Sequence, residues 1–350
     1  MMDVLEPLFA PLLYPLDPSR RVFVLFLLTS TLMVLIFNAF HRRNSSNNPN
    51  NSPITVPLSH IFSKKLWLHP STWLDIRSLF INSLIKSALI APYVVTKMAI
   101  VLAVSGFLYK QWGPADIQLG SSESEFHHSA LILVFSITLF LCEDFSRFLQ
   151  HYLMHKIPFL WRIHKVHHQA EVLTPLTLYR IHPLEIALSS WRSAWVLGTI
   201  TGVFVYAFPG QITALEILGV DAFGFMFNAL GANLRHSPFP VSFGRFNHLF
   251  ISPVMHQIHH SQAPEHHNKN FGSCFSIWDK CFGSFYHTPQ AANNEAFNDP
   301  TSNRPLSFGC SEKSQHTLKE LYIDPIQPKW LASSTLFAKF DRFKKLGVSS

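Results

Sequence analysis

Three short histidine strings set the strongest constraint on how this 350-residue chain can fold. They occupy residues 151–155, 164–168 and 256–260, and they read HYLMH, HKVHH and HQIHH. Positions i, i+3 and i+4 share one face of a helix, so each string is predicted to direct its imidazoles to one point. The strings hold eight histidines, more than one ion needs. The chain is therefore expected to bring the three segments together around two metal ions.

The rest of the sequence is typical of an integral membrane protein. Hydrophobic residues make up 48% of the chain and charged residues 14%, whereas a soluble domain carries about 25% charged residues. The apolar run at 22–40 is long enough to cross a bilayer. Four further apolar runs lie at 88–109, 130–142, 184–208 and 212–230. Pro209-Gly210 separates the last two as a helical hairpin. The predicted fold is all-α: a helical membrane bundle with a cytosolic, histidine-rich cap for two metals.

The charges beside the apolar runs predict the orientation of the chain. The loop 41–82 contains five Lys or Arg residues and one Asp, whereas the loop 110–128 contains one Lys and three acidic residues. Cytosolic loops of membrane proteins are enriched in Lys and Arg, so the first loop is predicted to be cytosolic and the second to lie opposite. The run at 130–142 then returns the chain to the cytosol at His151. All three histidine strings are expected on that face.

Several other classes of protein fit this sequence poorly. The net charge is +7, but the basic residues are scattered or flank apolar runs, so nucleic-acid binding is not predicted. The four cysteines form no C-x-x-C motif, which argues against a disulfide framework or a zinc ribbon. Isolated histidines are more often structural than ligating, and this role is expected for His60, His69, His127, His128, His248 and His316.

The strings themselves leave the metal open. Imidazole ligands without thiolate suit zinc, copper, iron and nickel, so ligand type does not separate these ions. Two first-row metals beside a bilayer suggest oxygen chemistry on a lipid.

The order and spacing of the strings resemble one known family. The series H-x3-H, H-x2-HH, H-x2-HH, spread over membrane hairpins, resembles the fatty acid hydroxylase/sterol desaturase superfamily of integral-membrane di-iron enzymes. The resemblance covers residues 139–286 and includes four segments: LWRIHKVHH at 160–168, IHPLE at 181–185, NFG at 270–272 and IWDKCFGSFY at 277–286. Their combination is much more specific than any one of them.

The resemblance implies a set of metal ligands for two iron ions. The histidines of the three strings match the family's iron-binding boxes, and two further histidines fall where relatives place additional ligands. The predicted ligands are His151, His155, His164, His167, His168, His182, His236, His256, His259 and His260. For His182 and His236 the alternative is a capping role or a role behind the ligands. His266 and His267 are not predicted as ligands, and no catalytic residue beyond the ligands is predicted.

Other residues near the strings are candidates for supporting the site. A ligating imidazole usually donates its other N–H to a carboxylate or a carbonyl. Four carboxylates lie near the strings: Asp144, Glu171, Glu185 and Asp279. The alternative for Asp144 and Glu185 is that they mark helix ends at the membrane interface. Three aromatic residues are candidates either for lining an apolar passage or for interfacial anchoring: Trp161, Trp278 and Tyr286.

The resemblance implies an oxygen-dependent oxidoreductase that hydroxylates or desaturates a lipid, whether a sterol, an ether lipid or a fatty acyl chain. Both reactions begin with removal of hydrogen from an unactivated C–H bond, so the sequence does not separate them. No fused cytochrome b5-like segment is recognised, and electrons are expected from a separate electron-transfer protein or a reduced pterin. The alternatives are a membrane protein that handles metal and a family member without catalytic activity.

Four parts are expected along the chain. Residues 1–43 contain the first transmembrane helix, and residues 44–83 form a polar cytosolic linker. Residues 84–290 form a membrane-embedded, fatty acid hydroxylase-like catalytic domain, and residues 291–350 form a cytosolic tail.

Overall fold

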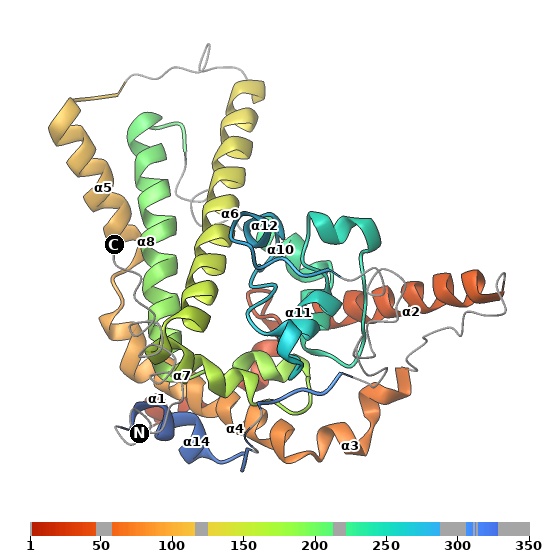
Figure 1. Cartoon of the computed structure of the whole chain (residues 1–350). Helices are drawn as coiled ribbons and strands as arrows, with labels where there is room; N and C mark the ends of the chain where they lie inside the picture. Colours follow the sequence, from red (N-terminus) through yellow and green to blue (C-terminus); the bar gives the residue numbers. More distant parts are fainter. Residues whose placement is uncertain are drawn as a thin grey trace, which may run out of the picture.

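The structure, a computed structural model, describes residues 2–46, 58–115, 125–212, 222–287, 306–310, 312 and 314–327. Within these residues the regular elements are helices, accompanied by two isolated bridges that join Phe250 to Phe275 and Ser261 to Phe308. The prediction of an all-helical chain is confirmed. Long helices stand upright in Figure 1, and shorter helices gather beside their lower halves.

The upright helices are α5 (Lys97–Trp112), α6 (Glu125–Lys156) and α8 (Pro183–Ala207), and α8 packs against both of the others. Two segments are long and apolar enough to cross a membrane, Pro70–Trp112 and Phe126–Lys156, with mean hydropathies of 1.9 and 1.7. Only 17% and 33% of their apolar windows are buried inside the protein, so most of these side chains face outward. Lipid contact requires such a surface, and the chain is associated with a membrane.

The first of these segments bends at a proline. α4 (Pro70–Ile85) passes into a π-helical turn, η3 (Lys86–Ile90), and a 3-10 turn, η4 (Ala91–Tyr93). Pro92 lacks the N–H that a continuous helix would need there. α5 then begins after its N-cap Thr96, whose side chain accepts a backbone N–H of the first turn. Figure 1 accordingly shows α4 lying across the direction of α5.

α2 (Val24–Ser46) contains the first apolar run, and in Figure 1 it lies to one side of the upright helices and runs crosswise to them. One face is buried: Phe26 and Val34 are 0% and 1% exposed, and α2 contacts α10 (Ala222–Ala229). The other face exposes large apolar side chains such as Leu28. The apolar part of α2 is shorter than the two candidate spans. α2 is thus a half-buried helix, and the transmembrane role of the run 22–40 stays a prediction.

The predicted hairpin is described in part. α8 corresponds to its first arm, and Gly210, with φ of 73°, supplies the left-handed backbone at the expected turn. Residues 213–221 lie outside the described residues, and α10 covers the end of the predicted second arm. The predicted linker at 44–83 and tail at 291–350 also lie partly outside them.

α5 and α8 approach each other closely because α8 presents glycines to α5. A Cβ added to Gly198 would lie 2.7 Å from Cβ of Ile100, and one added to Gly202 would lie 2.9 Å from the carbonyl oxygen of Val101. Small residues of this kind let helix backbones pack at short range in a membrane.

The second and third histidine strings lie on two short helices, α7 (Pro158–His168) and α11 (Pro253–His259). Each begins with proline at its first helical position, where the missing N–H costs no hydrogen bond. α7 packs against α6, and α11 packs against η6 (Ala232–His236). The lower end of α6 carries the first string, so the three strings meet there.

The C-terminal segment 314–327 closes this end of the molecule. Leu321 packs with Leu74 of α4 and Val166 of α7, and all three are at most 3% exposed. The Arg162 guanidinium donates to the Gln327 carbonyl at 2.8 Å. The remaining short helices are α1 (Met2–Phe9), η1 (Ala10–Leu16), η2 (Leu58–Phe62), α3 (Lys64–Trp67), η5 (Pro175–Tyr179), η7 (Gly244–His248), η8 (Pro264–His266), α12 (Ile277–Cys281), α14 (Leu318–Tyr322) and η10 (Asp324–Ile326).

Candidate metal centre

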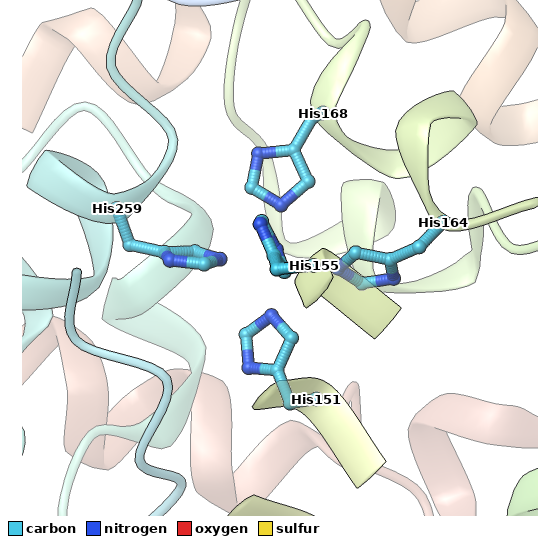
Figure 2. A group of neighbouring side chains, drawn as sticks. All are labelled: His151, His155, His164, His168 and His259. Atoms are coloured by element: carbon cyan, nitrogen blue, oxygen red, sulfur yellow. The ribbon is translucent and has the colours of Figure 1, made fainter. Parts of the chain in front are cut away.

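Five imidazoles from three helices surround one point (Figure 2). They belong to His151 and His155 of α6, His164 and His168 of α7, and His259 of α11. Their ligand nitrogens all lie within 4.8 Å of one another, and we call these residues group A.

The two nitrogens of each ring have different surroundings in group A. Nδ1 of His151 lies 2.8 Å from the carbonyl oxygen of Phe271, and Nδ1 of His259 lies 2.7 Å from that of Lys269. A carbonyl only accepts, so these Nδ1 atoms carry the proton and leave a lone pair on Nε2. The Nε2 atoms of all five rings are buried without a hydrogen-bond partner in the described part of the chain. Buried lone pairs that converge on one point fit a bound cation.

His164 has a carboxylate behind it. Its Nδ1 lies 2.9 Å from Oε1 of Glu185 in the first turn of α8, and the two side chains are 5% and 11% exposed. A carboxylate that accepts from the far nitrogen fixes the ring and raises its basicity toward a metal. Of the other predicted carboxylates, Asp144 and Asp279 hold backbone amides between residues 271 and 275.

Four further imidazoles form a second cluster, group B: His167, His236, His256 and His260. Nε2 of His236 lies 3.2, 3.0 and 3.2 Å from the Nε2 atoms of His167, His256 and His260. Ligands about 2.1 Å from a metal are about 3.0 Å apart at right angles and about 3.4 Å apart in a tetrahedron. The spacing in group B therefore fits nitrogens that share one ion. The groups adjoin, because the rings of His168 and His260 stack at 4.5 Å.

The structure divides the last two strings between the groups, which differs from the prediction that each string points to one place. His164 and His168 belong to group A and His167 to group B, whereas His256 and His260 belong to group B and His259 to group A. Residues at i and i+4 stay on one face, while the residue at i+3 is adjacent to i+4 and points about 100° away from it. Each of the last two strings can therefore supply ligands to both group A and group B.

Burial keeps the imidazoles of His168, His236, His259 and His260 in the form that binds metal. Removal from water lowers the pKa of His168 and His260 well below the usual value, with neighbouring histidines adding to the effect. Burial likewise lowers the pKa of His236 and His259 to about 3. These rings are neutral at physiological pH, and a neutral imidazole offers its lone pair to a metal.

His182, the tenth predicted ligand, lies outside both groups. It is the N-cap of α8: its Nδ1 accepts the Leu184 amide at 3.2 Å, and its Nε2 lies 3.3 Å from the Tyr322 carbonyl. With both nitrogens engaged, the ring caps a helix, which was the alternative for this residue. The Pro183 that follows is a helix-start signal in the sequence. We leave His182 out of the proposed ligand set.

The aromatic candidates have different surroundings. The Trp161 ring lies 4.8 Å from the ring of His155 and 5.4 Å from that of His168, directly against group A. Trp278 instead donates its indole N–H to Asp144 at 2.9 Å. Tyr286 lies beside His266, with ring centroids 5.1 Å apart. Trp161 is therefore the candidate that borders the metal centre.

Sequence reasoning missed the two carbonyls that hold His151 and His259, because every residue has a carbonyl. It also missed a third cluster in which two histidines assigned structural roles meet a carboxylate. Nε2 of His69 lies 3.8 Å, and Nε2 of His316 lies 3.4 Å, from Oε2 of Glu171. Their Nδ1 atoms accept from the Ser71 amide and the Arg180 guanidinium, at 3.2 and 3.3 Å. We call His69, Glu171 and His316 the clamp.

Comparison with known proteins identifies the family. Residues 136–284, which contain all three histidine strings, match the family model Fatty acid hydroxylase. The resemblance seen in the sequence is confirmed.

Curated relatives also match part of the chain. The ornithine lipid hydroxylase OlsE of Rhizobium tropici is 27% identical over 180 residues, which is 50% of this chain and 49% of that protein. The alkylglycerol monooxygenase of Caenorhabditis elegans is 27% identical over 143 residues, 41% of this chain and 25% of that protein. The human alkylglycerol monooxygenase is 26% identical over 42% of this chain and 29% of its own length. The chain thus spans half or less of these relatives, and no solved structure matches it.

Proposed function

We propose that this member of the fatty acid hydroxylase family is a membrane-embedded di-iron enzyme that uses oxygen to hydroxylate or desaturate a lipid. The observation that carries the proposal is the pair of adjoining imidazole groups, in which nine histidines, seven of them buried, direct ring nitrogens toward two points. Two ions at neighbouring positions can act together on one substrate, whereas a metal with a purely structural role needs only one position.

Iron is the proposed metal on the strength of the family, because imidazole ligation also suits zinc and copper. Bound in groups A and B, two iron ions would supply the oxygen activation that C–H cleavage needs. The chain's own residues hold the ions, keep the ligands neutral and exclude bulk water. Glu185 and the carbonyls of Lys269 and Phe271 orient the rings from behind.

A lipid substrate is supported by the apolar surface of α6, which extends to the histidines of group A. α6 runs without a break from an outward-facing apolar segment to His151 and His155. A lipid that lies along α6 would thus meet group A at the end of the same helix. Trp161, against His155, is an apolar surface for its chain. The names of the relatives, an ornithine lipid hydroxylase and alkylglycerol monooxygenases, point to polar lipids with long chains as the first substrates to test.

The orientation and the electron supply belong to the same proposal. We place the histidine groups at the cytosolic face of a multi-pass bundle, because the Lys and Arg residues of the loop 41–82 are expected there. We assign catalysis to residues 84–290 and expect a separate electron donor. Labelling of an Asn47→Cys variant in intact cells tests the orientation: an impermeant thiol reagent should leave this cysteine unlabelled, and labelling from outside would reverse the topology.

The decisive experiment combines metal analysis with turnover. Purified protein should hold about two ions per chain, and iron-loaded protein should consume oxygen and convert a long-chain lipid when an electron donor is added. Isotopic oxygen in the product would establish hydroxylation, and an unlabelled double bond would establish desaturation. Turnover that continues without oxygen would contradict the proposal. Metal binding without turnover of any lipid would favour a protein that handles metal.

A further inference from the structure

A single loop, residues 269–272, stands behind two of the group A ligands. Its carbonyls at Lys269 and Phe271 accept from His259 and His151, which lie on α11 and α6. The rings of these two histidines are 4.5 Å apart, so the loop joins two helices at the metal position. The direction of both Nε2 lone pairs therefore depends on where this loop is held.

The loop itself is held by one buried carboxylate. Asp279, which is 0% exposed, accepts the Phe271 amide at 2.8 Å, the Gly272 amide at 2.8 Å and the Ser284 hydroxyl at 2.6 Å. The approach is too close for a side chain on the loop, because a Cβ at Gly272 would lie 2.8 Å from Oδ2 of Asp279. Asn270 adopts φ of 55°, and its side chain bonds to the backbone of Tyr286, which closes the far side of the loop.

We propose that Asp279 is a positioning residue for group A, which acts through the loop 269–272. Its carboxylate fixes the amides of Phe271 and Gly272. It thereby sets the positions of the two loop carbonyls that accept hydrogen bonds from Nδ1 of His151 and His259. This inference rests on the proposed function, since it presupposes that groups A and B bind metal.

The effect is expected to be selective for one metal position. In group B, the Nδ1 atoms of His167, His256 and His260 have no hydrogen-bond partner among the described residues. Movement of the loop 269–272 thus removes orienting bonds from group A alone. Outer hydrogen bonds of this kind typically contribute about 10- to 100-fold to metal affinity.

The chain offers a matched control in Asp144. This carboxylate is 4% exposed and also accepts three bonds in the same region, from the amides of Cys274 and Phe275 and the indole of Trp278. The residues that it holds are not the ones whose carbonyls accept from His151 and His259. Its loss should cost stability comparably without freeing the loop 269–272.

The test compares wild type, Asp279→Asn and Asp144→Asn as full-length proteins in detergent, loaded with iron and dialysed against a chelator. Bound metal and the unfolding midpoint are measured together. Wild type should keep about two ions per chain, Asp279→Asn about one and Asp144→Asn about two, with similar falls in midpoint. An asparagine at 279 turns an amide N–H₂ toward a backbone N–H, so at least one of the loop bonds is lost.

Ser284→Ala is the milder variant in case Asp279→Asn does not fold. It removes one of the three hydrogen bonds to the Asp279 carboxylate. The affinity of group A for its ion should fall by a smaller factor than in Asp279→Asn. The inference is overturned if Asp279→Asn and Ser284→Ala both keep two ions as tightly as wild type. It is also overturned if Asp144→Asn loses metal to the same extent as Asp279→Asn. If wild type itself binds no metal, the proposed function fails instead.

Discussion

Two histidine-rich regions of this protein, the metal groups and the clamp, look alike in composition and differ in the state of their nitrogens. In group A the Nδ1 atoms with partners face oxygen acceptors, and every Nε2 is buried without a hydrogen-bond partner among the described residues. In the clamp the Nδ1 atoms of His69 and His316 accept N–H groups, so their Nε2 atoms carry the protons and face Glu171. What Nδ1 binds, rather than the number of nearby histidines, decides whether Nε2 can ligate a metal or instead donates a hydrogen bond.

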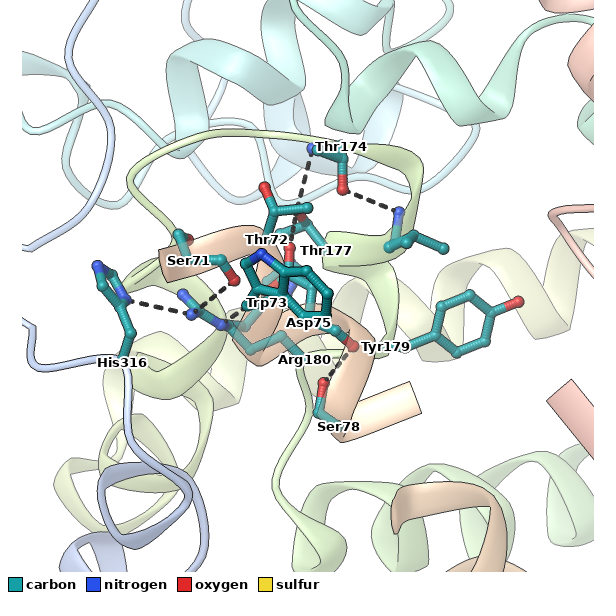
Figure 3. Close-up of polar contacts among 12 residues, drawn as sticks. Ser71, Thr72, Trp73, Asp75, Ser78, Thr174, Thr177, Tyr179, Arg180 and His316 are labelled. Carbon is teal, nitrogen blue, oxygen red and sulfur yellow. Dashed lines mark hydrogen bonds and ion pairs between the residues drawn. The ribbon is translucent and has the colours of Figure 1, made fainter. Parts of the chain in front are cut away.

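The charges around the clamp lead to the same assignment. Arg180, which contacts His316, also forms an ion pair with Asp75 at 2.9 Å, and both side chains are 0% exposed (Figure 3). Its guanidinium donates to the Ser71 carbonyl at 3.3 Å. A cation would therefore be bound next to a fixed positive charge. The clamp instead ties the C-terminal segment to α4, since Arg77 also donates to the His316 carbonyl.

The largest effect is expected from His168→Ala. His168 belongs to group A and its ring stacks on His260 of group B, so its loss disturbs both positions. Metal in group A should be lost, and turnover should fall by more than the roughly 100-fold that changes behind a ligand cause. Metal analysis and lipid turnover measure this. The control is His267→Ala, an exposed histidine outside both groups. Full activity in His168→Ala would remove this residue from the ligand set.

A smaller loss, confined to stability, is expected from Asp75→Asn. The variant leaves the buried Arg180 charge without its ion pair, and breaking a buried pair typically costs about 3–5 kcal/mol. Denaturant unfolding in micelles should show a lower midpoint, while the folded fraction still holds about two ions. Loss of metal from folded Asp75→Asn would show that the clamp region and the metal groups are one unit.

Glu185→Gln should act on metal affinity alone and by less. The amide keeps the size of the side chain but removes the charge behind His164, so the affinity of group A should fall about 10- to 100-fold. Competition with a chelator measures this change. Glu171→Gln is the paired control, because it alters the carboxylate of the clamp and should leave metal affinity as in wild type. Equal effects from both substitutions would remove the distinction between the two regions.

The smallest effect is expected from His69→Ala. Its side chain caps α4, and loss of a helix cap typically costs about 1 kcal/mol. The unfolding midpoint should fall slightly and the metal content should not change. The sharpest contrary result would be three ions in wild type and two in His69→Ala, because the clamp would then be a metal site.

Much of this site could be predicted from the sequence because its ligands come in regular spacings. The sequence predicted the three strings, His236 and a supporting role for Glu185, because histidine spacing on helices and a nearby carboxylate are local features. The role of His182 was not, because a cap and a ligand look the same until the start of α8 is known. The division of the last two strings between two groups depends on how α6, α7 and α11 cross. The orientation of α2 depends on tertiary packing, which an apolar run does not encode.

The tight contact at Gly198 and Gly202 has a mechanical consequence for the metal centre. α8 carries these glycines in its C-terminal half and Glu185 in its first turn, so a change in how α8 packs on α5 would change the position of Glu185. An alanine at Gly202 would act as a wedge between the two helices, because its Cβ would meet the Val101 carbonyl. The resulting tilt would reach the carboxylate behind His164 several helical turns away. The fit of two helices within the lipid-facing part thus contributes to how one imidazole is aimed.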